Sequence, residues 1–270
     1  MTALTPTVHA PSRSRTPAAG VTDMVFIRRS IMHSLRDGEG IVMAIMLPVL
    51  LMLLFTFVFG GAMEVGGAGG YVDYIVPGII LLCAGFGASS TAMYVARDLT
   101  TGIMGRFRTM PIRGNAVLTG HVVASVLRNL IATGVVFAVG LLVGFRPTAT
   151  PLEWIAAIGV IALYILVITW LFAAIGLAAG TPEAANGYGF ILLFLPYLSS
   201  AFVPVETMPD WLQWVAENQP ITPIIETLRS LLMGTPMEGS GIAALLWCAA
   251  ILAVAIVWGA WMFRRKAGRR

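Results

Sequence analysis

Few side chains in this sequence of 270 residues could perform chemistry. It contains three histidines, two cysteines and a single lysine, namely His9, His33, His121, Cys83, Cys248 and Lys266. A nucleophilic dyad would need a histidine opposite a serine at membrane depth, and a metal site would need clustered ligands; the sequence offers neither pattern. A nucleotide-binding P-loop needs a lysine after a glycine-rich turn, whereas Lys266 lies in the C-terminal tail. The sequence therefore predicts no catalytic residues, no metal site and no ATPase site of its own.

The most distinctive polar segment is a basic stretch at residues 97–114, RDLTTGIMGRFRTMPIRG, which lies between long apolar runs. Apolar residues recur in it at spacings of four, four and three, which places them on one face of a helix that Pro111 ends: Leu99, Ile103, Phe107 and Met110. Two interpretations are open. The stretch is a basic loop lying on anionic lipid, or it is a helix that docks into a groove of a cytoplasmic partner.

The composition requires a lipid environment around this stretch. Hydrophobic residues make up 58% of the chain and charged residues 11%, against about 25% charged in a soluble domain. A helix needs about 20 apolar residues to cross a bilayer. Six stretches qualify, so we expect an all-α membrane protein with six transmembrane helices at about 41–59, 75–96, 129–145, 154–178, 187–205 and 242–263. Residues 1–21 and 266–270 read as a flexible tail and a short basic tail.

The distribution of basic residues sets the predicted orientation. Arginines gather before the first span, between the second and third spans and after the sixth, whereas Arg146 and Arg229 fall on the other face. Lysine and arginine mark cytoplasmic loops, so we expect both termini and the basic stretch to be cytoplasmic. This bias also accounts for the pI of 9.4 without a nucleic-acid partner. Arg128 falls at the inner edge of the third predicted span, where we expect its side chain to snorkel to the interface.

Two further segments have a helical pattern but are too polar or too short to span. Residues 22–37 predict an interfacial helix that lies flat before the first span. Residues 205–240 predict two outer helices, one around Pro209 to Ala216 and a second capped by Thr222 and ended by Gly234. These outer helices dip into the membrane interface, or the segment is a loop that merely covers the bundle.

The energy source must lie outside this chain if the protein is a pump. A carrier driven by an ion gradient keeps ionisable groups within its spans, and the central parts of the six predicted spans hold none. The remaining source is nucleotide hydrolysis, for which the chain lacks the motif. A separate polypeptide would bind ATP and Mg²⁺, and the basic stretch would receive its motion.

Two blocks carry a resemblance to a known family. RDLTTGIMGRFRTMPIRGNAVLTG begins at Arg97, and LPYLSSAFVPVETMPDWLQWVAENQPITPIIETLRSLLMG covers residues 195–234. In residue types, spacing and position the chain resembles, over residues 22–265, the permeases of ABC type-2 exporters of the daunorubicin-resistance type. The resemblance implies a cytoplasmic coupling helix at about 98–110, re-entrant outer helices at about 208–233, and a dimer of permeases, expected to be identical chains, carrying two ATP-binding cassette subunits.

The resemblance also assigns roles to individual residues. Coupling to the ATPase subunit would fall to Asp98, Gly102, Ile103, Arg106, Phe107, Pro111 and Arg113, with Asp98 at the start of the coupling helix. The short inner loop 180–187, with Glu183 and Asn186, would form a second, smaller contact, although its lack of basic residues gives that role no support from topology.

The expected cargo follows from the scarcity of charge in the spans. A cavity between two permeases would suit a hydrophobic or amphipathic drug, or a lipid. Its lining would include Phe86, Tyr94, Phe190, Phe194 and Tyr197, unless these aromatic residues only pack helices together. We therefore expect a multi-pass permease subunit of an ATP-driven exporter in a bacterial plasma membrane, in contact with membrane lipids. The alternatives are the permease of a polysaccharide-type ABC exporter, or a membrane scaffold or channel that transports nothing.

Overall fold

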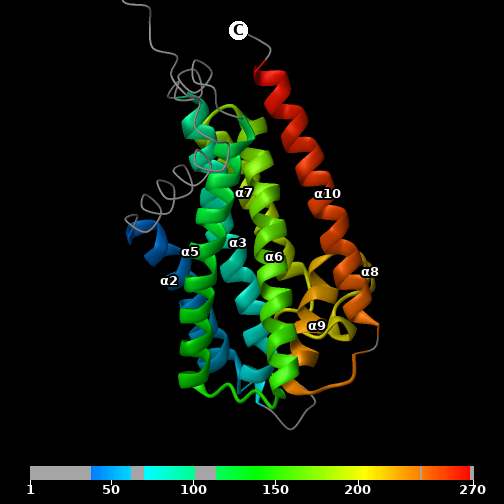
Figure 1. Ribbon diagram of the computed structural model, residues 1–270. Helices are drawn as coiled ribbons and strands as arrows, with labels where there is room; N and C mark the ends of the chain where they lie inside the picture. Colours follow the sequence, from blue (N-terminus) through cyan, green and yellow to red (C-terminus); the bar gives the residue numbers. More distant parts are fainter. Residues whose placement is uncertain (1–37, 62–69, 101–113, 238, 268–270) are drawn as a thin grey trace, which may run out of the picture.

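The computed structural model describes residues 38–61, 70–100, 114–237 and 239–267, and these ranges are helical and contain no strand. Four helices are each long and apolar enough to cross a membrane: α3 (Tyr71–Thr100), α5 (Gly114–Val143), α6 (Pro151–Ala179) and α10 (Ser240–Ala267). They run along the length of one bundle (Figure 1). The tail 1–21 and the predicted interfacial helix 22–37 lie outside the described residues.

The helix α3 forms the centre of the bundle. It packs against α2 (Gly38–Leu54), α5, α6, α7 (Pro182–Leu192) and α9 (Ile221–Met233). Its middle is fully buried, from Ile79 to Cys83. By contrast α10, which packs mainly on α6 and α9, leaves residues such as Val254 and Val257 exposed. A helix that is apolar on all sides and exposed on one side fits a surface that faces lipid.

Close packing between α3 and α6 depends on Gly176. A Cβ atom at this position would clash with the carbonyl oxygen of Ala92 and would lie 2.9 Å from its Cα atom. Small residues allow two helix backbones to approach closely, and Gly176 does so here. At the other end of α3, Gly78 approaches Ala201 just as closely, since a Cβ there would lie 2.7 Å from the Ala201 Cβ.

The predicted spans agree with the structure to different degrees. Spans 75–96, 154–178 and 242–263 lie inside α3, α6 and α10. Span 41–59 corresponds to α2 and a π-helical turn at Phe55–Phe59, which together form a shorter apolar helix. Span 129–145 is only the second half of α5, which already begins at Gly114.

The predicted span 187–205 is wrong as a single helix. Helix α7 begins earlier, at Pro182 after the capping residue Thr181, and ends at Leu192. A 3₁₀ turn at Leu195–Leu198 follows, and non-helical turns continue to the next 3₁₀ turn at Val205–Thr207. Pro196 lies in the first of these turns, where its missing N–H group removes one bond of the helical ladder.

Two short outer helices follow, as predicted: α8 (Asp210–Asn218) and α9. Gly234, with a φ angle of +66°, ends α9. The predicted cap at Thr222 is wrong, because α9 begins at Ile221 after Pro220 and Thr222 is buried inside the helix. Helix α9 packs against α3, α6 and α10.

The helix ends separate by charge. The carboxyl ends of α3, α6 and α10 meet the amino ends of α5 and α7 at the top of Figure 1. We call this the basic end, because Arg97, Arg264 and Arg265 lie there in the final turns of α3 and α10. At the opposite end, the first turns of α3, α6 and α8 carry Asp73, Glu153 and Asp210. This separation agrees with the charge bias behind the predicted orientation.

Candidate functional site

The predicted coupling segment is framed by two described helices. Asp98 lies in α3, and the other residues assigned to coupling lie outside the described residues: Gly102, Ile103, Arg106, Phe107, Pro111 and Arg113. The structure therefore shows how the two flanks of the segment are held, at the end of α3 and the beginning of α5.

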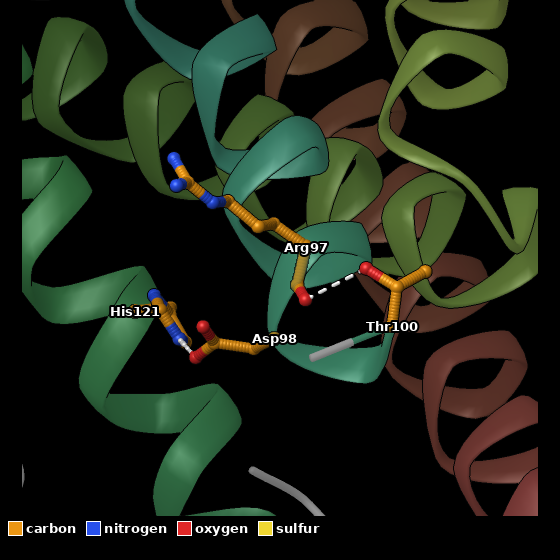
Figure 2. Close-up of polar contacts among 4 residues, drawn as sticks. All are labelled: Arg97, Asp98, Thr100 and His121. Atoms are coloured by element: carbon orange, nitrogen blue, oxygen red, sulfur yellow. Dashed lines mark hydrogen bonds and ion pairs between the residues drawn. The ribbon is translucent and has the colours of Figure 1, made fainter. Parts of the chain in front are cut away.

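A contact between Asp98 and His121 joins these flanks. The Oδ2 atom of Asp98 lies 2.8 Å from Nε2 of His121, which belongs to α5 (Figure 2). The two side chains are 27% and 20% exposed, so water reaches the contact only in part. Asp98 lies near the carboxyl end of α3, and the expectation that it begins a separate helix is wrong.

The neighbours of Asp98 have local or structural contacts. The hydroxyl of Thr100 donates to the carbonyl oxygen of Arg97 at 2.9 Å, within the same helical turn (Figure 2). Leu99 packs against a buried cluster at the basic end made of Val95, Val122, Ala173 and Leu177. Leu99 is therefore partly buried against the bundle, and the other residues of the predicted stripe, Ile103, Phe107 and Met110, lie outside the described residues.

Polar contacts continue from Asp98 toward the middle of the bundle, always between α3 and α5. Thr91 and Ser125 share a hydrogen bond of 2.5 Å. One turn further, Nη2 of Arg128 donates to the carbonyl oxygen of Gly87 at 3.0 Å and to the hydroxyl oxygen of Ser90. The amide of Asn129 donates to the carbonyl oxygen of Ala84 at 2.8 Å. We call this line of contacts, from Asp98–His121 to Ala84–Asn129, the α3–α5 seam.

The seam links α3 and α5 by several hydrogen bonds along their length. Residue numbers fall along α3 as they rise along α5, as antiparallel neighbours require. Each hydrogen bond contributes about 0.5–1.5 kcal/mol, and sliding one helix along the other would break several at once. The two helices that flank segment 101–113 are thus held to each other at several points along their length.

The structure contradicts the expectation that the Arg128 side chain extends to the membrane interface. It lies near the middle of the 30-residue helix α5, is 3% exposed and lies 5.5 Å from the centre of the Tyr94 ring. The residues before it continue the helix and pack on α3, so the side chain points into the helix interface. Gly87 leaves room for the neighbouring side chain of Asn129, because a Cβ atom at position 87 would lie 2.6 Å from Cγ of Asn129. The sequence signal was present, since Arg128, Asn129 and Ser125 share one helical face.

The aromatic residues predicted to line a cavity divide into two groups. Phe190 and Phe194 are 56% and 51% exposed, and their ring centroids lie 5.2 Å apart. The ring of Tyr197 follows at 6.1 Å from Phe194. Phe86 and Tyr94 both lie on α3, where Phe86 packs against the core and Tyr94 lies beside Arg128. The structure thus brings three of the five together on α7 and the turn after it.

The predicted second contact loop is the beginning of a helix. Thr181 caps α7 by accepting a hydrogen bond from the N–H group of Ala184 at 3.2 Å. Glu183 and Asn186 therefore lie in the first two turns of α7, at the basic end, and not in a loop.

A second polar cluster holds the turn between α7 and α8. Nη2 of Arg229 donates to the carbonyl oxygen of Ser200 at 2.6 Å and to that of Tyr74 at 3.2 Å, and the guanidinium lies 3.8 Å from the centre of the Tyr74 ring. The hydroxyl of Tyr71 donates to the carbonyl oxygen of Phe202 at 2.9 Å. Burial raises the pKa of the Glu226 carboxyl on α9, against the lowering effect of Arg229. Side chains of α3 and α9 therefore hold the outer turn by its main chain.

Comparison with known families decides the broad assignment. Residues 24–233 match the ABC-2 type transporter family. The chain belongs to this family. The match covers the seam, the basic stretch and the outer helices, which are the parts on which the resemblance in the sequence rests.

Relatives of this ABC-2 type chain are named as permeases. It is 30% identical to the daunorubicin resistance ABC transporter permease protein DrrB1 of Streptomyces coeruleorubidus, over 83% of this chain and 78% of that protein. It is 26% identical to the probable doxorubicin resistance ABC transporter permease protein DrrC of Mycobacterium tuberculosis, over 82% and 80%. It is 25% identical to the putative transport permease ycf38 of Cyanophora paradoxa, over 77% and 72%. With its apolar helices, the chain is a multi-pass protein of the plasma membrane.

Proposed function

We propose that this protein is the membrane-spanning permease subunit of an ATP-driven exporter. The observation that carries the proposal is the ABC-2 type match over residues 24–233, supported by relatives that are named as permeases of ABC transporters. A separate ATP-binding cassette subunit, present in two copies, binds ATP and Mg²⁺ and hydrolyses the nucleotide. Two identical permease chains form the pathway.

Coupling uses the basic stretch as a lever. Closure of the ATPase subunits on ATP displaces segment 98–113, with Ile103 and Phe107 seated in a groove of the ATPase subunit and the arginines at its rim. The Asp98–His121 contact and the rest of the α3–α5 seam support this role, because they tie both flanks of the lever to the core. Glu183 and Asn186, at the start of α7, add a smaller contact at the same end.

The cargo is a hydrophobic or amphipathic drug, or a lipid. The aromatic row of Phe190, Phe194 and the partly buried Tyr197 supports this class, because its two phenylalanines offer exposed apolar and polarisable surface. The relatives named for daunorubicin and doxorubicin resistance support it as well.

The test is reconstitution with the ATPase subunit expressed alongside the permease. The two proteins should copurify in equal amounts, and a transported drug should stimulate ATP hydrolysis. Phe107→Asp should abolish the stimulation without changing the helix content of the permease, because a buried carboxylate cannot remain in an apolar groove. A matched control is Leu152→Asp, at an exposed position on α6 far from the basic end. Unchanged stimulation in Phe107→Asp would refute the lever.

Loss of the gene distinguishes the alternatives. An exporter of this class predicts sensitivity to a toxic compound or depletion of an exported lipid. Loss of surface polysaccharide alone would assign a polysaccharide exporter, and absence of any copurifying ATPase would assign a scaffold or channel.

A further inference from the structure

Among the described residues, Arg128 has a buried guanidinium to which the proposed function gives no role. It is 3% exposed within a helix whose segment Thr119–Val143 is long and apolar enough to span the membrane. The ion pair found among the described residues joins Asp98 and His121, so no carboxylate there neutralises Arg128. An uncompensated charge at membrane depth is costly and marks a site that handles ions or substrate.

Joining α3 to α5 does not require this charge. The neighbouring residue, Asn129, joins the same two helices with a neutral amide that donates to the carbonyl oxygen of Ala84 at 2.8 Å. Arg128 makes an equivalent contact with Gly87. A neutral donor at position 128 would serve the seam with a far smaller desolvation penalty.

The guanidinium also has donors left over. An arginine carries five N–H donors, and in the described residues both acceptors of Arg128, the Gly87 carbonyl and the Ser90 hydroxyl, bind Nη2. Neither acceptor carries a charge. An acidic group would therefore gain charge-assisted hydrogen bonds that the protein itself does not provide.

The guanidinium lies directly behind an accessible strip of α3. Five residues of α3 at helical spacing are partly or largely exposed and form what we call the α3 stripe: Phe86, Ser89, Ser90, Met93 and Arg97. Met93 is 39% exposed. Ser90 belongs to the stripe and also accepts the hydrogen bond from Arg128, so a ligand on the stripe is one side chain away from the guanidinium.

We propose that Arg128, together with Ser90, binds the acidic headgroup of an amphipathic cargo whose apolar part lies along the α3 stripe. The chemistry required is a carboxylate or phosphate oxygen on an apolar body. This proposal rests on the proposed exporter function, because only a transporter has a cargo. It narrows the class of cargo from amphipathic molecules to acidic amphipathic molecules. The Tyr94 ring lies 5.5 Å from the same guanidinium.

The experiment measures binding to the permease alone, in nanodiscs of zwitterionic phosphatidylcholine. A photoreactive phenylalanine replaces Met93, and three alkyl probes of equal chain length carry a phosphate, a carboxylate or a trimethylammonium headgroup. Capture is normalised to the partition of each probe into empty nanodiscs. We expect at least about tenfold preference for an acidic probe over the cationic one, the size of one charge-assisted hydrogen bond. Preference for phosphate indicates a lipid-like cargo, and preference for carboxylate indicates an acidic drug; either result supports the site.

Variants separate binding from a purely structural role. Arg128→Gln should abolish the preference, Arg128→Lys should retain it, and Ser90→Ala should reduce it without abolishing it, because the headgroup loses the Ser90 hydroxyl while the charge of Arg128 remains. Arg97→Gln tests the competing assignment, in which the exposed guanidinium on the same stripe, and not Arg128, attracts the acidic probe. Equal capture of acidic and cationic probes by the unsubstituted chain would overturn the proposal, even if Arg128→Gln failed to fold. So would loss of the preference in Arg97→Gln with Arg128→Gln unaffected. Neither result would touch stimulated ATP hydrolysis, which tests the exporter function separately.

Discussion

Asp98 and His121 connect the two helices that lead into and out of the basic stretch, with 2.8 Å between Oδ2 and Nε2. The contact lies at the end of the α3–α5 seam nearest to segment 101–113. In the proposed lever mechanism, a force applied to that segment would reach the seam first at this pair, so its position would matter more than its strength.

The pair predicts a coupling defect without unfolding. Asp98→Asn and His121→Gln should each reduce drug-stimulated ATP hydrolysis several-fold in the reconstituted complex. A partly exposed pair contributes only about 0.2–1 kcal/mol to stability, so thermal unfolding of the permease should change little. Thr100→Ala is the control, because the Thr100 hydroxyl bonds only within its own turn in the described contacts. Equal loss of stimulation in all three variants would argue against a specific role of the pair.

The close approach at Gly176 predicts that one added methyl group lowers the stability of the bundle. Gly176→Ala should destabilise the bundle by about 1–3 kcal/mol, because the new Cβ atom meets the Ala92 main chain and must separate α3 from α6. Thermal unfolding in detergent measures the effect. Gly159→Ala on the same helix meets nothing within 4 Å and should be neutral or slightly stabilising. Indistinguishable unfolding of the two variants would contradict the close approach.

We expect that removal of the Arg229 guanidinium loosens the turn between α7 and α8. Arg229→Met should lower the free energy of unfolding by about 2–4 kcal/mol, because the carbonyl oxygens of Tyr74 and Ser200 lose their donor. Limited proteolysis between residues 198 and 210 should accelerate. Arg146→Met, at an exposed position where the side chain donates to the carbonyl oxygens of Leu141 at the end of α5 and of Phe145, should have a much smaller effect. An unchanged cleavage rate in Arg229→Met would remove the assigned function of the cluster.

Glu226 predicts a pH dependence of stability. Its folded-state pKa is raised above the ordinary value of 4.5 by burial, so folding favours the protonated carboxyl. The associated stability is fully present below the unfolded-state pKa and is lost as the pH rises through the folded-state pKa. Glu226→Gln should therefore unfold at a higher temperature than the parent chain at neutral pH, with a flatter pH profile. Glu183→Gln, at an exposed position at the basic end of the bundle, should leave the profile unchanged; a parent profile that is already flat would contradict the assignment.

Apolar length predicts the long helices but not where each one begins. Spans 75–96, 154–178 and 242–263 lie inside observed helices because lipid-exposed or fully buried helices are apolar throughout. The first half of α5 is more polar, because it pairs with α3 through Ser125 and Arg128. The span predicted from the sequence begins at position 129, after these residues, and therefore places Arg128 at the edge of the span, whereas the structure buries it against α3.

The partners within the candidate site depend on long-range pairing. Nothing in the sequence says that position 128 meets position 87 or that position 121 meets position 98. The break after Leu192 shows a related limit, since an apolar run of spanning length can contain turns when Pro196 and its neighbours are held by side chains of other helices.

The placement of the basic stretch is tested most directly by labelling a single thiol at Thr109. The variant carries Thr109→Cys with Cys83 and Cys248, both buried, replaced by alanine. We predict that a membrane-impermeant maleimide labels it in inverted vesicles and not in intact cells, and that the bound ATPase subunit protects it. Labelling from outside intact cells, with no protection by the ATPase subunit, would contradict the account.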